Sequence, residues 1–257
     1  MTTVRTLIFS AIIGLLFSCS SNNRQQDGAT TFTDDFKKLD TTVSFSGCWL
    51  SEDYYNSIRQ FNSPKKAQDG SQFIVIPDKT LQQTIMIYNF HEGGPFLKIL
   101  KHGNDYEIWE VQDDSLTQRL STIEVLSATK IKLGDKTFVK INPLKNQDTE
   151  QILEEILFKG QYTNSNGKTI EFKPNGQVIG LDNFHFYDPI IDYFDEGMQV
   201  DQIRLGNSQT ELDYYGFKFQ GNTLELFKLN CIEFDSTSKN CGVVEYGQLI
   251  HKLWRKE

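Results

Sequence analysis

The sequence predicts an all-β protein made of two tandem antiparallel β-barrels with only short helices. Short strand-like segments recur at spacings of about 8–12 residues, with turn-forming residues between them. One opening pattern, F-x-G-x-aromatic, also occurs twice, at Phe45–Trp49 and at Phe158–Tyr162. Because no long helices separate the strands, the pattern argues against a parallel α/β sheet.

Composition excludes some classes of function. The chain has 257 residues, 34 acidic and 26 basic, and a formal net charge of −8. An acidic surface repels phosphate backbones, so nucleic acid is excluded as a partner. The 4 Cys and 4 His are too scattered for a zinc framework, and the sequence contains no G-x-S-x-G, P-loop, G-x-G-x-x-G or H-E-x-x-H motif. The sequence therefore assigns no catalytic residue, metal ligand or cofactor, and gives no reason to name an enzyme.

The N-terminal residues 1–18 are typical of a signal peptide. Arg5 is the only charged residue, and an apolar run from Leu7 to Phe17 follows it. Eleven helical residues rise only about 16 Å, whereas the core of a bilayer is roughly 30 Å thick. We therefore expect this segment to be removed rather than to span the membrane.

The signal peptide ends in Leu16-Phe17-Ser18-Cys19, which resembles the lipobox of bacterial lipoproteins, in particular those of the Bacteroidetes type. This resemblance implies cleavage before Cys19 and lipid attachment at Cys19, with residues 19–40 as lipidated N-terminus and flexible tether. The Ser after Cys19 is similar to an outer-membrane sorting signal, which implies an outer-membrane protein that faces the periplasm. The alternative is an ordinary secretory cleavage site.

The first predicted barrel domain covers residues 41–145. Its only predicted helix runs from Ser51 to Phe61, with Ser51 as the N-cap and two acids at the positive end of the helix dipole. Strand-like segments follow the opening pattern at residues 73–76, 84–88, 96–101, 105–111, 116–126, 130–133 and 138–141.

The second predicted domain covers residues 146–257. Residues 142–158 are a turn-rich linker followed by apolar residues at helical spacing, so a short helix is expected after a boundary near Asn146. Strands are then predicted at residues 169–172, 177–180, 214–219, 223–229 and 243–254, with hairpin turns at 173–176 and 220–222. We expect each domain to have its own core.

The opening pattern carries a second resemblance. Gly47-Cys48-Trp49 matches the G-x-W motif that begins lipocalin barrels, and Gly160-Gln161-Tyr162 is a weaker match. The resemblance implies that the aromatic ring closes one end of each barrel and that a basic residue from the last strand packs on it. The candidates are Lys140 for Trp49, and Arg255 or Lys252 for Tyr162. Another antiparallel barrel or a sandwich remains the alternative.

Lipocalins often hold one small apolar molecule, so the resemblance implies a small apolar or amphipathic ligand. The candidate cavity residues are Trp109, Phe217 and Phe219. Eight-stranded barrels are also filled by their own side chains in some proteins. In that case, binding of a protein partner in the envelope is the expected function.

The cysteines after residue 40 have separate expected roles. Cys231 and Cys241 flank a turn of a predicted hairpin, and an oxidising envelope permits a disulfide between them. Cys48 lies inside G-x-W and is expected to be a small buried residue.

Two polar clusters have simpler structural explanations than a site. The cluster His91-Glu92-Gly93-Gly94-Pro95 is expected at a hairpin tip, and the acid-rich stretch 188–197 as a solvated loop. Aromatic and acidic residues from Asn183 to Glu196 support an alternative function, a glycan-binding accessory lipoprotein or a carbohydrate-active enzyme.

Overall fold

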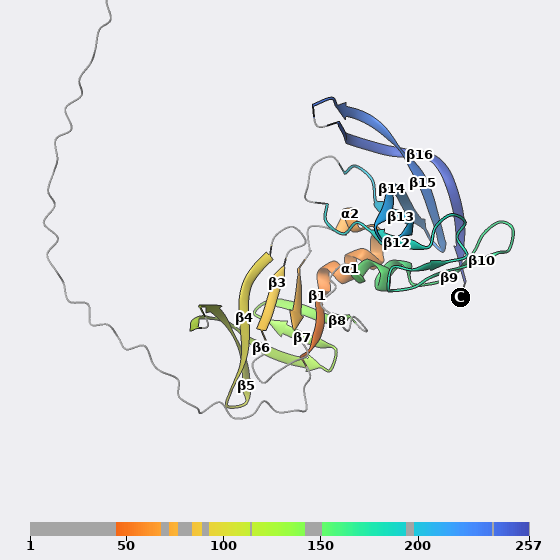
Figure 1. Ribbon diagram of the computed structural model, residues 1–257. Coiled ribbons are helices and arrows are strands. Elements are labelled where there is room, and N and C mark those ends of the chain that lie inside the picture. Colours follow the sequence, from red (N-terminus) through yellow and green to blue (C-terminus); the bar gives the residue numbers. More distant parts are fainter. Residues whose placement is uncertain are drawn as a thin grey trace, which may run out of the picture. The chain divides into compact units, whose positions relative to one another are not determined.

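The computed structural model describes residues 45–67, 72–76, 84–88, 93–113, 115–141, 151–193, 198–237 and 239–256. These residues form mostly β-strands, arranged in two antiparallel sheets (Figure 1). The signal peptide, Cys19 and the tether lie outside the described residues, as do the boundary near Asn146, His91 and Glu92, so the predictions for them stay predictions. Within the described ranges, no helix has the length and hydropathy needed to cross a bilayer.

The first sheet closes into a barrel in which every strand pairs with its neighbour in sequence and β8 returns to β1. In β1, Trp49 lies opposite Lys140 of β8 and opposite Ile74 of β2. The eight strands are β1 (Gly47–Ser51), β2 (Phe73–Ile76), β3 (Thr84–Tyr88), β4 (Gly93–His102), β5 (Asp105–Gln112), β6 (Ser115–Ser127), β7 (Lys130–Leu133) and β8 (Lys136–Ile141).

Helix α1 (Glu52–Phe61) follows β1 directly, and a short helix α2 (Pro64–Ala67) follows α1. The Ser51 hydroxyl accepts a hydrogen bond from the Tyr54 N–H at 3.5 Å, and Glu52 and Asp53 occupy the first turn. The predicted cap and bounds of this helix are therefore confirmed. A third helical element, the π-helix η3 (Glu154–Phe158), lies where the short helix was expected before the second sheet.

The second sheet contains eight strands in the order β11-β10-β9-β16-β15-β14-β13-β12. Beside the outer strands, an isolated bridge joins Gln177, just before β11, to Phe186 of β12, and the Val178 N–H donates to the His185 carbonyl. The strands are β9 (Gly160–Thr163), β10 (Thr169–Phe172), β11 (Val178–Ile179), β12 (Phe186–Pro189), β13 (Gln202–Ser208), β14 (Glu211–Gln220), β15 (Thr223–Asp235) and β16 (Asn240–Arg255).

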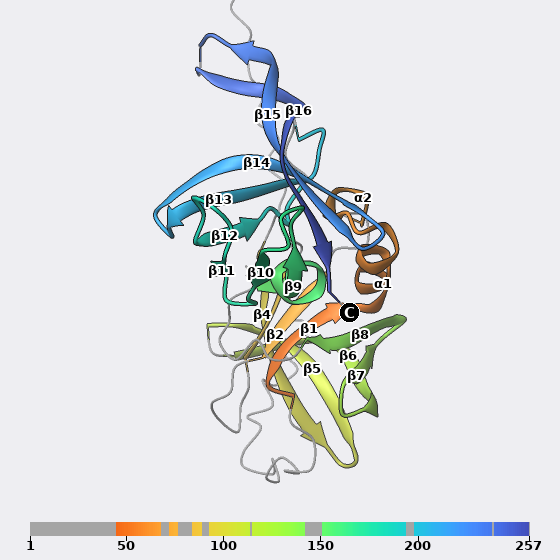
Figure 2. The same cartoon turned by 90° about the vertical axis from the view of Figure 1, so that its right-hand side faces the viewer.

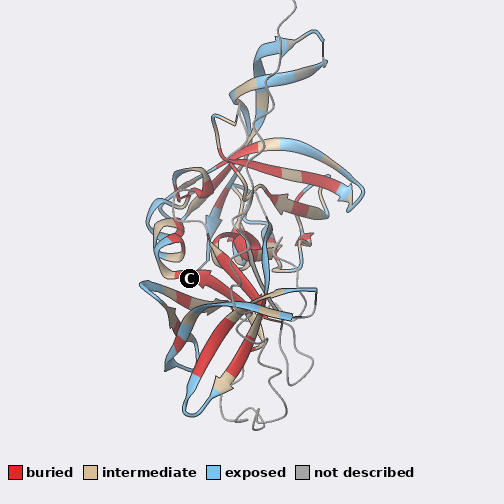
Figure 3. Cartoon of the chain, turned by 90° about the vertical axis from the view of Figure 1, so that its left-hand side faces the viewer, coloured by how far each residue is buried: buried red, intermediate tan, exposed pale blue. Residues whose placement is uncertain are grey.

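Buried apolar side chains form two clusters. Figure 3 shows the buried residues of the chain in red. The first fills the barrel and contains residues from its strands and the segment before β1. Its members are Phe45, Trp49, Ile74, Ile76, Leu97, Ile99, Tyr106, Ile108, Ile123, Ile131 and Phe138. The second contains the inward residues of the second sheet and of η3, together with residues of α1 and of three barrel strands.

Strand β1 contributes to both clusters because side chains alternate between the two faces of a strand. Trp49 belongs to the barrel cluster, whereas Cys48 and Leu50 belong to the second cluster. Strand β2 alternates in the same way, so both strands are buried on both faces. The prediction that each half has a separate core is therefore wrong: the second cluster takes residues from both halves of the chain.

Candidate functional site

The barrel-closing contact predicted at Trp49 has three components. The Trp49 ring is buried, and its Nε1–H donates to the Phe45 carbonyl at 2.7 Å. The Lys140 ammonium lies 5.3 Å from the centre of the ring, within the range of a cation–π contact. Gly47 has φ 122°, a backbone conformation that favours glycine, and a Cβ there would lie 3.0 Å from Cε of the Lys140 side chain.

The second half contains the same arrangement at Tyr162. The Tyr162 hydroxyl donates to the Phe158 carbonyl at 2.9 Å, again four residues earlier, and the Arg255 guanidinium lies 5.3 Å over the ring. Nη2 of Arg255 also donates to the carbonyls of Leu157 and Lys159. Burial raises the pKa of Tyr162 to about 12, although Arg255 acts in the opposite direction.

Of the two basic candidates for Tyr162, the structure selects Arg255. Lys252 instead forms an ion pair with Glu225 at 2.8 Å. Gly160 repeats the role of Gly47, with φ 143° and Arg255 Nε as the nearest atom to an added Cβ, at 3.7 Å. The four motif residues Gly47, Trp49, Gly160 and Tyr162 therefore form two equivalent sites, one per sheet.

We predict that Arg255→Met lowers the free energy of unfolding by about 1–3 kcal/mol, because it removes hydrogen bonds from a charged donor and a cation–π contact. Arg255→Lys is expected to lower the free energy of unfolding by less than Arg255→Met. The lysine ammonium keeps the positive charge but lacks the planar guanidinium and its fixed N–H donors. Urea unfolding followed by far-UV circular dichroism measures the difference. Lys218→Met, at an exposed position of β14, is the control and is expected to stay within about 0.5 kcal/mol of the parent.

The three candidate cavity residues do not come together. Phe217 is fully buried, and its ring and that of Phe219 lie 5.0 and 5.3 Å from the ring of Phe158. Trp109 follows Ile108, which faces the barrel interior, so by alternation the indole lies on the outer face of β5. The two phenylalanines are packing partners in the second cluster.

On the outer face of the barrel, Trp109 belongs to a polar cluster around Glu107. The Glu107 carboxylate accepts hydrogen bonds from Trp109 Nε1 and from Arg119, each at 2.9 Å, and the exposed His102 ring lies 3.8 Å away. Burial alone would raise the pKa of Glu107, but these two hydrogen bonds outweigh it and hold the pKa below its usual value. The carboxylate is thus ionised and satisfied by protein groups, as in a structural ion pair.

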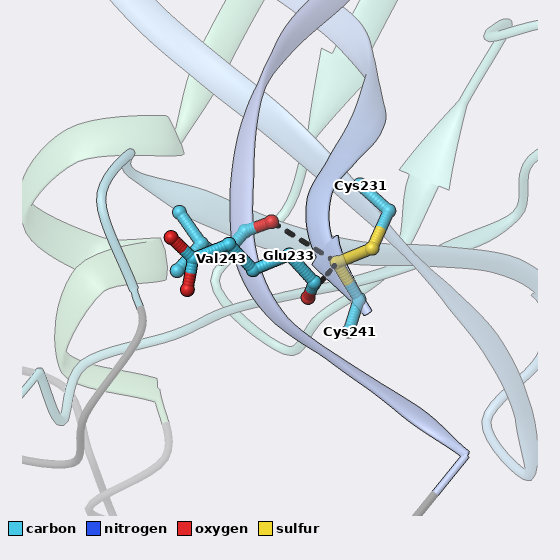
Figure 4. The surroundings of a disulfide bond; sticks show 4 residues. All are labelled: Cys231, Glu233, Cys241 and Val243. Carbon is cyan, nitrogen blue, oxygen red and sulfur yellow. Dashed lines mark hydrogen bonds between the residues drawn. A yellow bond between two sulfur atoms is a disulfide. The ribbon is translucent and has the colours of Figure 1, made fainter. Parts of the chain in front are cut away.

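The predicted disulfide is confirmed. Cys231 and Cys241 are bonded with a Cα–Cα distance of 5.7 Å, across the hairpin formed by β15 and β16 (Figure 4). The Cys241 sulfur lies 3.0 Å from the Val243 carbonyl oxygen and 3.5 Å from that of Glu233. An oxidised sulfur carries no hydrogen to donate, so in this state these are close contacts. Cys48 is buried, and burial raises its pKa to about 12, as expected of an inert thiol.

The aromatic residues that suggested a glycan site are largely used in packing. Tyr187 and Tyr193 are buried, and the Tyr193 hydroxyl accepts a hydrogen bond from the Gln202 N–H at 2.7 Å. The Phe184 ring packs edge-on against Tyr215 at 5.2 Å. These three aromatic residues are therefore used in packing, whereas Phe194 lies outside the described residues, so the glycan-binding alternative stays a prediction.

The acid-rich stretch is partly in a strand. Asp188 and Pro189 belong to β12, and Asp188 forms an ion pair with Arg204 of β13, so the prediction of a loop is wrong for these two residues. Residues 194–197 lie outside the described part of the chain. Among the described residues, no group of three or more His, Cys, Asp or Glu side chains is arranged to hold a metal ion.

Sequence reasoning missed a buried acid, Asp201, that joins the two halves. Its Oδ1 accepts a hydrogen bond from the Lys65 N–H of α2 at 3.0 Å, and its carboxylate also accepts one from the Ser63 side chain. Burial raises the pKa of Asp201 above its usual value, although both hydrogen bonds oppose this effect. No local pattern marks this residue, because its partner Lys65 lies 136 positions away in the sequence and Ser63 lies still farther.

We predict that Asp201 makes folding less favourable as the pH rises. The pKa of Asp201 is higher in the folded chain than in the unfolded chain, where it is near 3.8. Its contribution to stability is therefore fully present below pH 3.8. It is lost as the pH rises through the folded pKa. Asp201→Asn keeps an oxygen for Lys65 but cannot ionise. The free energy of unfolding of the parent minus that of the variant should therefore fall between pH 4 and pH 7, measured by urea titrations at each pH. A difference that rises over this range would contradict the prediction.

Searches against protein-family models, curated proteins and solved structures find no match to this chain.

Proposed function

We propose that this chain is a lipid-anchored protein of the cell envelope whose mature part consists of two tandem lipocalin-like units and binds a protein partner without catalysis. The lipobox-like segment ending at Cys19 supports the anchor. The matched contacts of Trp49 with Lys140 and of Tyr162 with Arg255 support two related units. The bridge beside β11 and β12 supports a barrel-like second unit.

The observation that favours a partner over a ligand is the packing inside each unit. In the second unit, the Phe158 ring lies within 5.0 to 5.9 Å of four other aromatic rings, those of Phe172, Tyr187, Phe217 and Phe219. In the first, Trp49, Phe138 and the aliphatic residues of the barrel cluster occupy the interior. An interior filled by side chains leaves no space for a ligand there, so we expect binding to involve the outer surface.

Large apolar side chains on the outside add a second argument. Phe96 is 61% exposed, and Ile232 and Phe234 are 54% and 64% exposed. Exposed apolar residues that are scattered singly are normal in a monomer. When a partner covers them, burial of their apolar surface contributes to binding. An envelope protein held at the membrane by its lipid can meet partners that are anchored in the same way.

Native mass spectrometry of the purified, delipidated protein tests the choice between ligand and partner. We expect the mass of the bare chain and no retention of an added lipid probe. A stoichiometric small molecule that co-purifies with the chain would overturn the proposal in favour of a ligand carrier. A positive signal on a glycan array would instead favour the glycan-binding alternative.

The anchor is tested separately. Cys19→Ser is expected to abolish labelling with radioactive palmitate and to leave the protein unprocessed or release it from membranes, because the thiol is the attachment atom. Cys48→Ser is the matched control and should label like the parent, since Cys48 is buried in the folded chain. Labelling of the Cys19→Ser variant at the parental level would show that the anchor is assigned wrongly.

A further inference from the structure

The hairpin of β15 and β16 continues beyond the rest of the second sheet as a two-stranded arm (Figures 1 and 2). We call residues 230–245 the distal arm. Pairing between β14 and β15 ends at Lys228, and β16 pairs with β9 only at Trp254 and Arg255. The described residues of the distal arm therefore pair only with each other.

The distal arm contributes nothing to either apolar cluster. The second cluster includes Leu226 and Leu253, and Ile250 packs against it, but no residue of the distal arm takes part. Every residue of the distal arm whose burial is described is exposed or half-buried. At the base of the arm the situation differs, because the Tyr246 hydroxyl donates to the Phe217 carbonyl at 2.8 Å and its ring packs on Phe227. A two-stranded hairpin without a packed face is marginally stable in water.

The backbone ladder of the arm is also interrupted. The pair Cys231↔Val244 is followed by Glu233↔Val243, which leaves Ile232 as an extra residue on β15. The next pair, Phe234↔Cys241, leaves Gly242 as an extra residue on β16. The disulfide between Cys231 and Cys241 spans these two irregularities, so the covalent bond bridges the interrupted part of the arm's ladder.

From this geometry we propose that the Cys231–Cys241 disulfide is a redox-controlled clasp. In the oxidised protein it keeps the distal arm ordered, and its reduction opens the arm while the body of the second sheet stays folded. The step is thiol–disulfide exchange with a dithiol. The dithiol forms a mixed disulfide with one cysteine, then closes to its own disulfide, so two electrons and two protons pass to Cys231 and Cys241. The oxidised form of the same dithiol reverses the reaction.

The clasp has a consequence for the surface of the protein. Ile232 and Phe234 protrude from the ordered arm and are among its most exposed apolar side chains. Opening the arm removes their fixed geometry, whereas the closed barrel and both ring contacts with the basic residues are unchanged. The redox state of one bond therefore controls one surface feature and leaves the fold intact.

Hydrogen exchange of the mature protein with and without dithiothreitol tests the clasp. The chain-entropy model for a loop of this length predicts that reduction increases the open population of the arm, and hence amide exchange in residues 230–245, by roughly 100-fold. Exchange in β9, in β14 and around Tyr246 should stay unchanged. Alkylation of both sulfurs, checked by mass, shows that reduction is complete.

Two variants serve as controls for this experiment. In Cys231→Ser/Cys241→Ser the arm should exchange quickly at once and show no response to the dithiol, whereas Cys48→Ser should respond like the parent. Unchanged arm protection in the fully reduced protein would overturn the proposal. Equal loss of protection throughout β9–β16 would overturn it as well, because the bond would then stabilise the whole sheet. Neither result depends on lipid anchoring or on a partner.

Discussion

Trp49→Ala is expected to lower the free energy of unfolding by about 3–5 kcal/mol, as for other truncations of large buried side chains. The ring is 1% exposed and lies in the barrel cluster. The variant also leaves the Phe45 carbonyl without its donor and removes the ring under Lys140. Since domains of ordinary size are stable by about 5–15 kcal/mol, this loss is a large part of the total.

Urea unfolding of two further variants separates the components of this effect. Trp49→Phe keeps most of the buried area but removes the indole donor, so it should cost clearly less than Trp49→Ala. Trp254→Ala is the matched control, because that indole is 38% exposed and belongs to neither cluster. If Trp254→Ala and Trp49→Ala are equally destabilising, burial of the barrel ring is not the cause.

The structure also changes where the damage from Trp49→Ala is expected. With separate cores, loss of amide protection would be confined to residues 41–145. Because Cys48 and Leu50 on the same strand pack in the second cluster, disorder of β1 removes support from the second sheet. We therefore expect amide exchange to rise in η3 and β9 as well, though less than in the barrel strands.

Local patterns predicted much of this architecture. Ser51 followed by two acids located the start of α1 correctly, and alternating residues located most strands to within a few positions. The G-x-W resemblance indicated Lys140 for Trp49, and it narrowed the basic partner of Tyr162 to Arg255 or Lys252, of which the structure places Arg255 on the ring. These successes share one property: each depends on residues close in sequence or on a motif with fixed partners.

Interactions between distant residues account for the main failures. Cys48-Trp49-Leu50 and Phe73–Ile76 are continuous apolar runs, which is a signal of strands buried on both faces, but it does not say which second surface covers them. Strand β12 was missed because it is short and contains Asp188 and Pro189. Strand β13 was overlooked although Ile203 and Leu205 alternate in it.

The distal arm shows a different limit. Strand periodicity predicted segments at 223–229 and 243–254, and only the two cysteines that flank the turn indicated a hairpin between them, whereas β15 continues to Asp235 and β16 begins at Asn240. The two strands of the arm are joined by their backbone pairing and by the disulfide, and no residue of the arm belongs to an apolar cluster. Hydrophobic periodicity detects strands that pack on something, so it does not extend to a ribbon exposed on both faces.

Phe158→Ala is the second substitution with a large expected effect, about 3–5 kcal/mol. The side chain is fully buried at the end of η3, and its ring packs against Phe172, Tyr187 and Phe217 at 5.0 to 5.9 Å. Its carbonyl also accepts the hydrogen bond from Tyr162, which the substitution leaves in place. The effect therefore measures the packing of the interior and not the loss of the barrel-closing contact.

The matched control is Phe234→Ala, because that ring is 64% exposed on the distal arm and should change stability by less than about 0.5 kcal/mol. Nuclear magnetic resonance titration of the folded variants with a small apolar probe, in the absence of denaturant, adds a test of whether the interior is filled. If the interior is filled as the ring contacts indicate, only Phe158→Ala creates an apolar cavity, and only this variant should bind a small probe such as benzene or xenon. Equal binding of the probe by the parent would mean that the unit already has space for a ligand, and the preference for a protein partner would then lose its main support.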